Sequence, residues 1–260
     1  MRTRSFALVA LSLAGALMPA GAQSLADRIA AAGDGIVTFH FTPRPGVCGD
    51  GEHFVRTGRS SYHGSFSQSG RMEPCMAGPV QVRLTLEAGE VNRLQFWVGP
   101  LRSREACDLG RVPAPDAARY LLTIAARGTP RSSAKAIMPA VLADSAVVWP
   151  ELLAIAKDTD TRSRTTRMES MVWLSRFASA AIAGRRNDPF YEDDDERGDE
   201  SLETQAVFVL SQLKNGAGIP DLLTVARTNR SVHVRSHALF WLGQSGDPRA
   251  IALFESVLRS

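Results

Sequence analysis

The sequence lacks an excess of charge of either sign, because its 260 residues include 30 Lys and Arg and 27 Asp and Glu. Nucleic-acid-binding proteins and proteins held on anionic membranes usually have a clear basic surface, so we expect neither kind of partner. The composition also lacks the biases of disordered, collagenous and coiled-coil chains, since 44% of the residues are hydrophobic and 22% are charged. The length suits one large domain or two modest ones.

Motifs of several enzyme classes are also missing. The sequence has no Cys-x-x-Cys and no G-x-S-x-G, and the Gly-rich residues 46–51 match neither Walker A nor G-x-G-x-x-G. His233 and His237 are four residues apart, as in half of a zinc site, but Val234 stands where an H-E-x-x-H motif has Glu. We therefore expect no catalytic, cofactor-binding or metal-binding residues, and two solvent-exposed histidines.

The only long apolar run is at the N-terminus, at residues 6–17, and it is too short to span a bilayer. It follows two arginines and precedes small residues at 20–22, which is typical of a secretory signal peptide. We predict removal of residues 1–22, export to the periplasm or the extracellular space, and no stable membrane insertion; an uncleaved anchor is the alternative. Without its two arginines the chain would have 28 basic residues against 27 acidic ones, a net charge of +1.

Export would permit a disulfide among the three cysteines. We favour Cys48–Cys75, because both lie in a Gly-rich region and flank a polar excursion; closing that loop would stabilise by about 3–4 kcal/mol. Cys107 is then expected to be a free, partly buried thiol. The other two pairings and the fully reduced state remain alternatives.

Residues 23–110 have the pattern of a small antiparallel β unit, because apolar and polar residues alternate in several short stretches. Ser24 can cap a preceding helix at 25–32, and the polar turn at 87–90 joins two of the strands into a hairpin. The expected strands are 36–42, 53–56, 80–85 and 93–98.

Residues 111–260 have helical periodicity instead. A first helix is expected from about Asp116 to Ala126, and Gly128-Thr129-Pro130 ends it. Three later segments, 168–176, 204–212 and 236–244, align without gaps, and their central leucines are 36 and 32 residues apart. A fourth segment with a similar pattern lies 32 residues before the first of them.

Each of the four segments has a largely apolar stripe at positions i, i+4, i+7 and i+8 of a helix. The expected inward residues are Ala134, Met138, Val141 and Leu142; Thr166, Ser170, Trp173 and Leu174; Leu202, Ala206, Val209 and Leu210; and Val234, Ala238, Trp241 and Leu242. A shorter second helix is expected at 150–157, 177–182, 220–227 and 248–255. One such hairpin cannot bury its stripe alone, so the four hairpins are expected to stack, each on the next, as an α-solenoid.

The last unit resembles the short bacterial units of the HEAT repeat family. The resemblance rests on Val234-Arg235, Ala238, Leu242-Gly243, Gly246-Asp247-Pro248 and Ile251. It is strongest at 201–258 and extends more weakly over about half the chain. It implies an α-solenoid that binds proteins or peptides, as this family commonly does along the second helices of its hairpins. Together with the β unit at 23–110, this predicts an α+β protein: a small antiparallel β unit followed by an α-solenoid of about four HEAT-like hairpins.

Residues 192–200 contain seven acids in nine positions. A Ca²⁺ loop alternates its ligands, and three consecutive Asp do not reproduce that spacing. We interpret the segment as a solvated insertion; a docking strip for a basic partner is the alternative.

These patterns predict an exported, non-enzymatic scaffold that needs no cofactor and binds another protein or peptide; they do not indicate an oligomeric state. One alternative is a lyase, because some relatives of the short HEAT-like repeats attach tetrapyrrole chromophores. Another is a metal-binding envelope module that uses the cysteines and histidines of the β unit, although the spacings do not favour it. The histidines concerned are His40, His53 and His63. The partner-binding candidates are Glu151, Lys157, Asp221, Arg227, Arg249 and Glu255.

Overall fold

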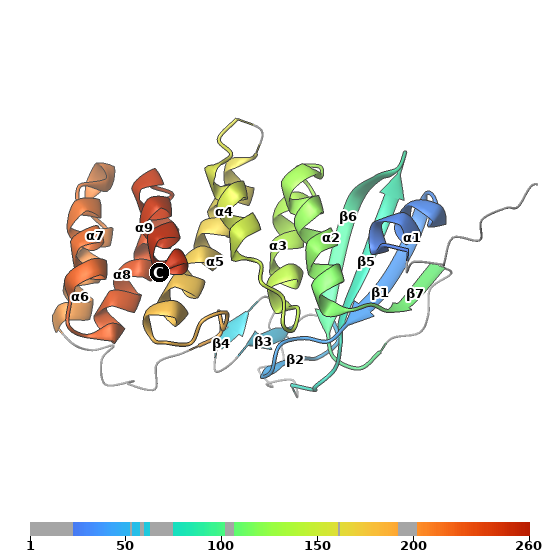
Figure 1. The fold of residues 1–260 in the computed structure, drawn as a ribbon, viewed down its shortest axis with the longest axis horizontal. Coiled ribbons are helices and arrows are strands. Elements are labelled where there is room, and N and C mark those ends of the chain that lie inside the picture. The colour runs from blue at the N-terminus through green and yellow to red at the C-terminus, as the bar shows by residue number, and fades with distance from the viewer. Residues whose placement is uncertain are drawn as a thin grey trace, which may run out of the picture.

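The N-terminal half is built on a four-stranded sheet with the strand order β6-β5-β1-β7 (Figure 1). The computed structural model describes residues 23–52, 54–57, 60–62, 75–101, 107–160, 162–191 and 202–260. The expected signal peptide, the acidic segment, His53 and His63 therefore lie outside the described residues.

The expected hairpin and first strand are present in this sheet. The strands are β1 (Gly35–Phe41), β5 (Val80–Glu87), β6 (Glu90–Val98) and β7 (Cys107–Arg111). The strands β1, β5 and β6 pair antiparallel, whereas β7 pairs parallel to β1, so the sheet is mixed and not purely antiparallel. The sequence CDLGR of β7 did not predict a strand, because this edge strand is only half-buried and has no apolar alternation.

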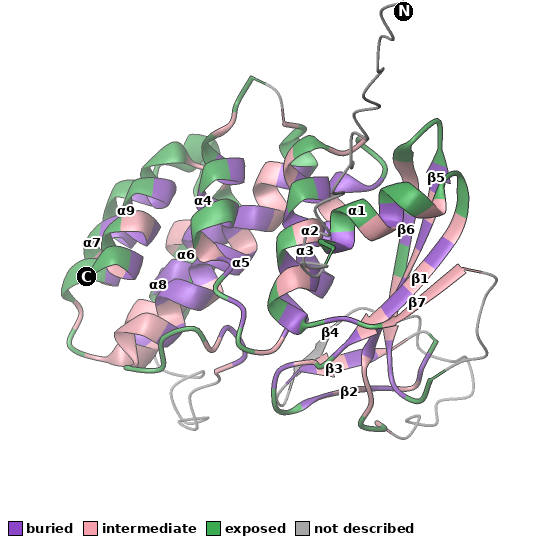
Figure 2. Cartoon of the chain, turned by 45° about the vertical axis from the view of Figure 1, so that its right-hand side comes forward, coloured by how far each residue is buried: buried purple, intermediate pink, exposed green. Residues whose placement is uncertain are grey.

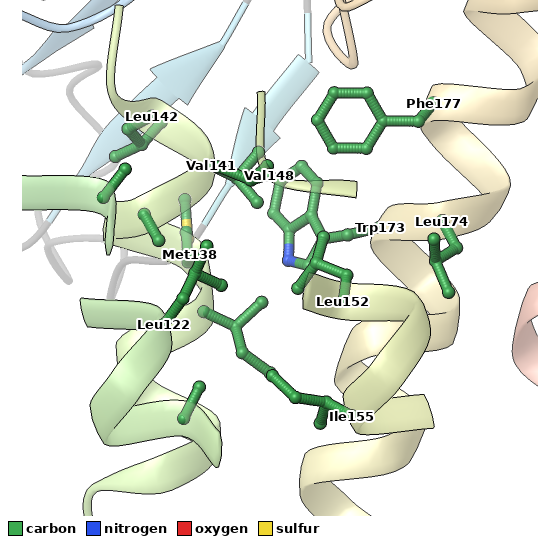
Figure 3. Packing of buried hydrophobic residues seen from close by; sticks show 14 of the residues in the cluster. Leu122, Met138, Val141, Leu142, Val148, Leu152, Ile155, Trp173, Leu174 and Phe177 are labelled. Carbon is green, nitrogen blue, oxygen red and sulfur yellow. The ribbon is translucent and has the colours of Figure 1, made fainter. Parts of the chain in front are cut away.

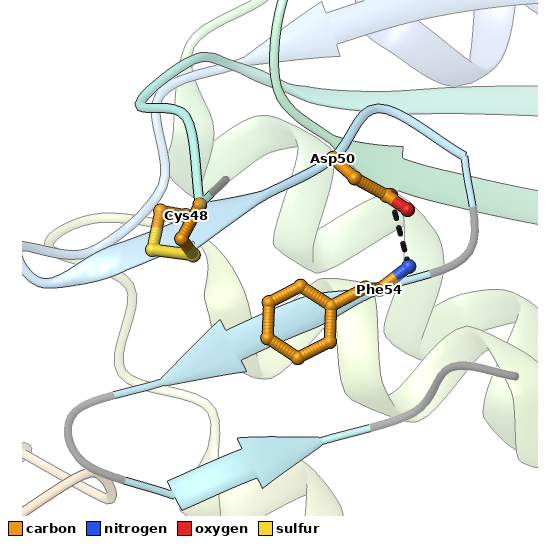
Figure 4. Close-up of a disulfide and its surroundings, with 4 residues drawn as sticks. Cys48, Asp50 and Phe54 are labelled. Atoms are coloured by element: carbon orange, nitrogen blue, oxygen red, sulfur yellow. Dashed lines mark hydrogen bonds between the residues drawn. A yellow bond between two sulfur atoms is a disulfide. The ribbon is translucent and has the colours of Figure 1, made fainter. Parts of the chain in front are cut away.

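A second, smaller sheet lies beside the first in the order β2-β3-β4. Its strands are β2 (Val47–Gly49), β3 (Val55–Thr57) and β4 (Ser60–Tyr62). The structure contains the favoured disulfide, Cys48–Cys75, with the two Cα atoms 5.3 Å apart (Figure 4). After β2 the Asp50 carboxylate accepts the backbone N–H of Phe54 at 2.9 Å, which shapes the turn into β3. Cys107 is the free, half-buried thiol that was expected.

The helix α1 (Leu25–Ala32) covers one end of the sheet and is capped by Ser24 as predicted. The helices α2 to α9 make up the C-terminal half. Their bounds are α2 (Ala114–Arg127), α3 (Ser133–Leu142), α4 (Trp149–Lys157), α5 (Arg164–Ile182), α6 (Leu202–Ser211), α7 (Ile219–Thr228), α8 (Val232–Ser245) and α9 (Pro248–Arg259). Pro150, Pro220 and Pro248 lie in the first turn of their helices as expected, since Pro in the first turn removes no helical hydrogen bond.

The helices pack in pairs that form two rows (Figure 1). One row contains α3, α5, α8 and α6, and the other contains α2, α4, α9 and α7. The expectation that each hairpin stacks on the next along the chain is wrong at one step, because α8–α9 lies between α4–α5 and α6–α7. The connection from Ile182 to Leu202 is long enough to pass this inserted hairpin.

Two details of the repeat prediction are also wrong. No separate helix starts at Phe177, because α5 continues unbroken to Ile182 and no Gly or Pro interrupts it. In α6 most of the expected stripe faces outward: Leu202 is 83% exposed and Val209 59% exposed, whereas Thr204 and Val207 are buried. The reason is that α6 ends its row and has a neighbour on one side only. Leu210, the last residue of that stripe, is half-buried and packs against the core.

The stripes of α3, α5 and α8 do form a common core. Leu142, Leu174 and Leu242 are fully buried, and Figure 3 shows the first two among the buried side chains of the shared core. The indole of Trp173 is buried in the same region, edge-on to Phe190 at 5.9 Å. Figure 2 shows buried residues facing inward along both rows and exposed residues facing out.

The β unit and the helices share one continuous core, and a buried arginine links them. Arg44 follows β1, and its backbone N–H donates to Leu142 O at the end of α3, 2.8 Å away. Its guanidinium donates from Nε to Val141 O at 2.8 Å, from Nη1 to Asn187 O at 2.7 Å, and from Nη2 to Ala146 O. Burial lowers the pKa of this guanidinium from its ordinary value. The boundary near residue 110 therefore separates two kinds of secondary structure that pack as one body.

Candidate functional site

The six partner-binding candidates all lie on the outer row of helices. Glu151 and Lys157 are on α4, Asp221 and Arg227 on α7, and the remaining two, Arg249 and Glu255, on α9. All are exposed except Glu255, which is half-buried. Because α9 lies between α4 and α7, the row brings together side chains that the sequence separates by up to 104 positions.

An ion pair joins α4 to α9 on this surface. Lys157 Nζ lies 2.6 Å from Glu255 Oε2, and Arg259 Nε lies 3.1 Å from the other oxygen of the same carboxylate. The Lys157 ammonium donates a hydrogen bond that, with the nearby Arg259, lowers the pKa of Glu255. The sequence indicated Lys157 and Glu255 as independent partner contacts and did not predict that they pair with each other.

The start of α9 has a second local ion pair. Asp247 is the N-cap, and its carboxylate accepts the backbone N–H of Arg249 at 2.8 Å. The Arg249 guanidinium donates to both oxygens of that carboxylate, at 2.8 and 2.9 Å. These contacts lower the pKa of Asp247 and raise that of Arg249. The cap and the ion pair thus hold Arg249 in place on the surface.

Next to the Lys157–Glu255 pair the surface is hollowed into a cavity of about 410 Å³, which we call the α4–α9 cavity. It is bounded by the end of α4, the first turns of α5, the turn between α8 and α9, and α9 itself. Its lining includes the charged Arg164 and Arg167 and the apolar Met168, Met171 and Ile251. The two arginines were not among the residues predicted from sequence. Their position within four residues of Ser163, the N-cap of α5, is the signal that could have revealed them.

The two C-terminal histidines are not solvated as expected. His233 and His237 are half-buried, and their rings lie 4.7 Å apart on one face of α8. Among the described residues, no group of three or more His, Cys, Asp and Glu side chains is arranged to hold a metal ion. Cys48 and Cys75 are joined in the disulfide and are not available as thiolate ligands.

The aromatic residues of the repeat stripes pack between helices. The Trp173 indole N–H donates to Glu169 at 2.9 Å within α5, which confirms this side chain as core. Trp241 is half-buried and lies 5.3 Å from the ring of Phe208, so it joins α8 to α6. Gly243, one of the residues that carry the resemblance, lies inside α8 and marks the crossing of this helix with α5.

In the part of the chain that the structure describes, no helix has both the length and the apolar composition needed to cross a bilayer.

Comparison with known proteins finds one matching repeat unit near the C-terminus. Residues 234–260 match the model of the PBS lyase HEAT-like repeat, which covers most of α8 and all of α9. No curated protein and no solved structure matches the chain. The match coincides with the segment whose residues carry the resemblance in the sequence, and it supports one HEAT-like unit. The wider helical half is assigned as a repeat region by the pairing of its helices.

Proposed function

We propose that this protein is an exported, non-enzymatic scaffold whose outer row of helices binds another protein or peptide. The observation that carries the proposal is the surface formed by α4, α9 and α7, which has exposed charges of both signs and adjoins the α4–α9 cavity. Mixed charges favour a polar protein surface over a polyanion. The HEAT-like match at residues 234–260 is consistent with a scaffold.

Affinity capture from an envelope extract tests the binding role. The bait variants are the wild-type protein, the charge reversal Arg227→Glu/Arg249→Glu, and the control Arg131→Glu/Lys135→Glu, whose two residues are exposed outside this row. We expect a partner that the wild-type and control baits retain equally and that the charge reversal loses at least tenfold. Equal recovery on all three baits would refute a binding role for this row.

The export part of the proposal has a separate measurement. Mass spectrometry of the protein from its native cell is expected to find an N-terminus at Gln23 and an oxidised Cys48–Cys75 pair. The Cys48–Cys75 bond supports this expectation weakly, because disulfides persist mainly in oxidising compartments. Recovery of chains that begin at Met1 with all cysteines reduced would contradict export.

A further inference from the structure

The first turn of α5 has a charge arrangement that is unfavourable for a helix by itself. Helix N-termini have a partial positive charge and free N–H groups, so acidic residues are favoured there and cations are not. The first turn of α5 contains no acid and has Arg164 and Arg167 instead. Both arginines line the α4–α9 cavity, so the positive end of the helix and two cationic residues lie at one hollow.

The acids beside this cavity already have other partners. The Glu255 carboxylate binds Lys157 at 2.6 Å and Arg259 at 3.1 Å. Asp158, at the end of α4, lies 3.8 Å from Arg162. Among the described residues, Arg164 and Arg167 have no carboxylate partner, and the Nε of Arg167 is buried without any hydrogen-bond acceptor. A buried N–H donor without an acceptor is costly, so an anion that accepted from Arg167 would remove this cost.

The rest of the lining is mixed: Lys157, Thr159, Ser245 and Glu255 are polar or charged, and the other residues are apolar or Gly. Met171 and Ile251 are buried residues of the core at its base, and Met168 lies half-buried beside them. A volume of about 410 Å³ is in the range of sites that take a small group and not an extended surface. Two arginines next to methionine and isoleucine suit a ligand that has one anionic group attached directly to an apolar one.

We propose that the α4–α9 cavity binds the C-terminal carboxylate of a partner polypeptide whose last residue is apolar. This inference rests on the proposed scaffold function. Arg164 and Arg167 bind the carboxylate, and the side chain of the last residue packs on Met168, Met171 and Ile251. A free phosphate would satisfy the arginines but leave the apolar lining unused. An internal acidic side chain would not place an apolar group and a carboxylate on the same carbon.

A peptide-binding assay by fluorescence anisotropy tests this directly. The probe is a rhodamine-labelled pool of pentapeptides with randomised internal positions and a C-terminal Leu, compared with the same pool amidated and with a pool ending in Gly. We expect the Leu free acid to bind at least tenfold more tightly than either. Equal affinity for the amidated pool, or displacement of the free acid by millimolar inorganic phosphate, would overturn the proposal.

The matched protein variants are Arg164→Gln/Arg167→Gln and the control Arg131→Gln/Arg186→Gln, whose residues are exposed outside the cavity. The first is expected to weaken binding at least tenfold, and the second to change it by less than twofold. Removing cations from the first turn of α5 should leave the melting temperature unchanged or raise it, so lost binding cannot be attributed to unfolding. Unchanged affinity in the first variant would overturn the assignment. If that variant still captures the envelope partner, the scaffold function stands without this cavity.

Discussion

Arg44 is charged and yet almost excluded from solvent, because three backbone carbonyls from the helical half accept its guanidinium hydrogen bonds. These carbonyls belong to the end of α3 and to two loops, so one side chain positions three segments against the β unit. Replacing it with an apolar residue would leave these acceptors without donors.

We predict that Arg44→Met lowers the free energy of unfolding by about 2–4 kcal/mol. Urea unfolding followed by circular dichroism measures the change, with the exposed Arg131→Met as the control, for which a change within about 0.5 kcal/mol is expected. A loss for Arg44→Met as small as that of the control would mean that the guanidinium does not join the two halves.

Asp247 provides a prediction that depends on pH. As N-cap of α9 it is expected to contribute about 1 kcal/mol, which Asp247→Ala removes. Its pKa in the folded protein is lowered, so its contribution is present above the ordinary value of 3.8 and is lost as the pH falls through the lower folded value. Urea unfolding of both proteins should therefore show a constant difference near neutral pH that shrinks in strong acid. A difference that grows on acidification would be inconsistent with this sign.

At the level of the helices, the crossing of α5 and α8 depends on a glycine. A Cβ on Gly243 would lie 2.6 Å from Ser175 Oγ and 3.1 Å from Met171 O, closer than van der Waals contact allows. Helix propensity alone favours Ala over Gly by about 1 kcal/mol. The crossing thus requires a residue that the isolated helix disfavours.

We predict that Gly243→Ala destabilises the protein despite this propensity, and that adding Ser175→Gly recovers part of the loss. Thermal unfolding of the two single variants and the double variant measures the coupling between the two sites. Stabilisation by Gly243→Ala, or purely additive effects, would place α8 away from α5.

The helix α6 shows why an apolar stripe does not identify its own neighbour. Leu202, Ala206 and Val209 have the spacing of the buried stripes, yet they face solvent, and Val207 is buried at 2% exposure. Both faces of α6 are apolar enough to be buried, so periodicity could not decide between them. The choice depends on which helix lies next to α6, and the sequence of α6 does not specify that.

The matched pair Val207→Asp and Val209→Asp tests the orientation of α6. A buried, unpaired carboxylate at position 207 is expected to cost about 3 kcal/mol or more, whereas the exposed position 209 should change stability by no more than about 0.5 kcal/mol. Chemical denaturation of both variants gives the comparison. The reverse order of effects would restore the stripe expected from sequence.

For the whole molecule, local patterns predicted most elements, and non-local contacts accounted for the errors. The alternation at 80–98 and the Pro-started helices depend on neighbouring residues, so the sequence was sufficient to place them. The parallel strand β7 depends on β1, about 70 residues earlier, and has no pattern of its own. The site was predicted only in part for the same reason. Lys157 and Glu255 were recognised as surface charges, but Arg164 and Arg167 become part of a site only because α9 forms one wall of the cavity.

The order of the stacked hairpins is the most consequential of these non-local features. If the hairpins followed chain order, α6–α7 would lie against α4–α5, and α9 would lie at the far end of the rows. In the structure α9 lies against α4, and the outer row, the ion pair and the cavity all depend on that contact.

Zero-length cross-linking with a carbodiimide tests this order most directly, since it joins only ammonium and carboxylate groups already in contact. The chain has three lysines, and Lys157 Nζ lies 2.6 Å from Glu255. We predict a Lys157–Glu255 isopeptide in the peptide mass spectrum of the folded protein, lost in Glu255→Gln and kept in Glu151→Gln. No such product, together with Lys157 joined to Glu203 or Asp221 of the α6–α7 hairpin, would show that the hairpins stack in chain order.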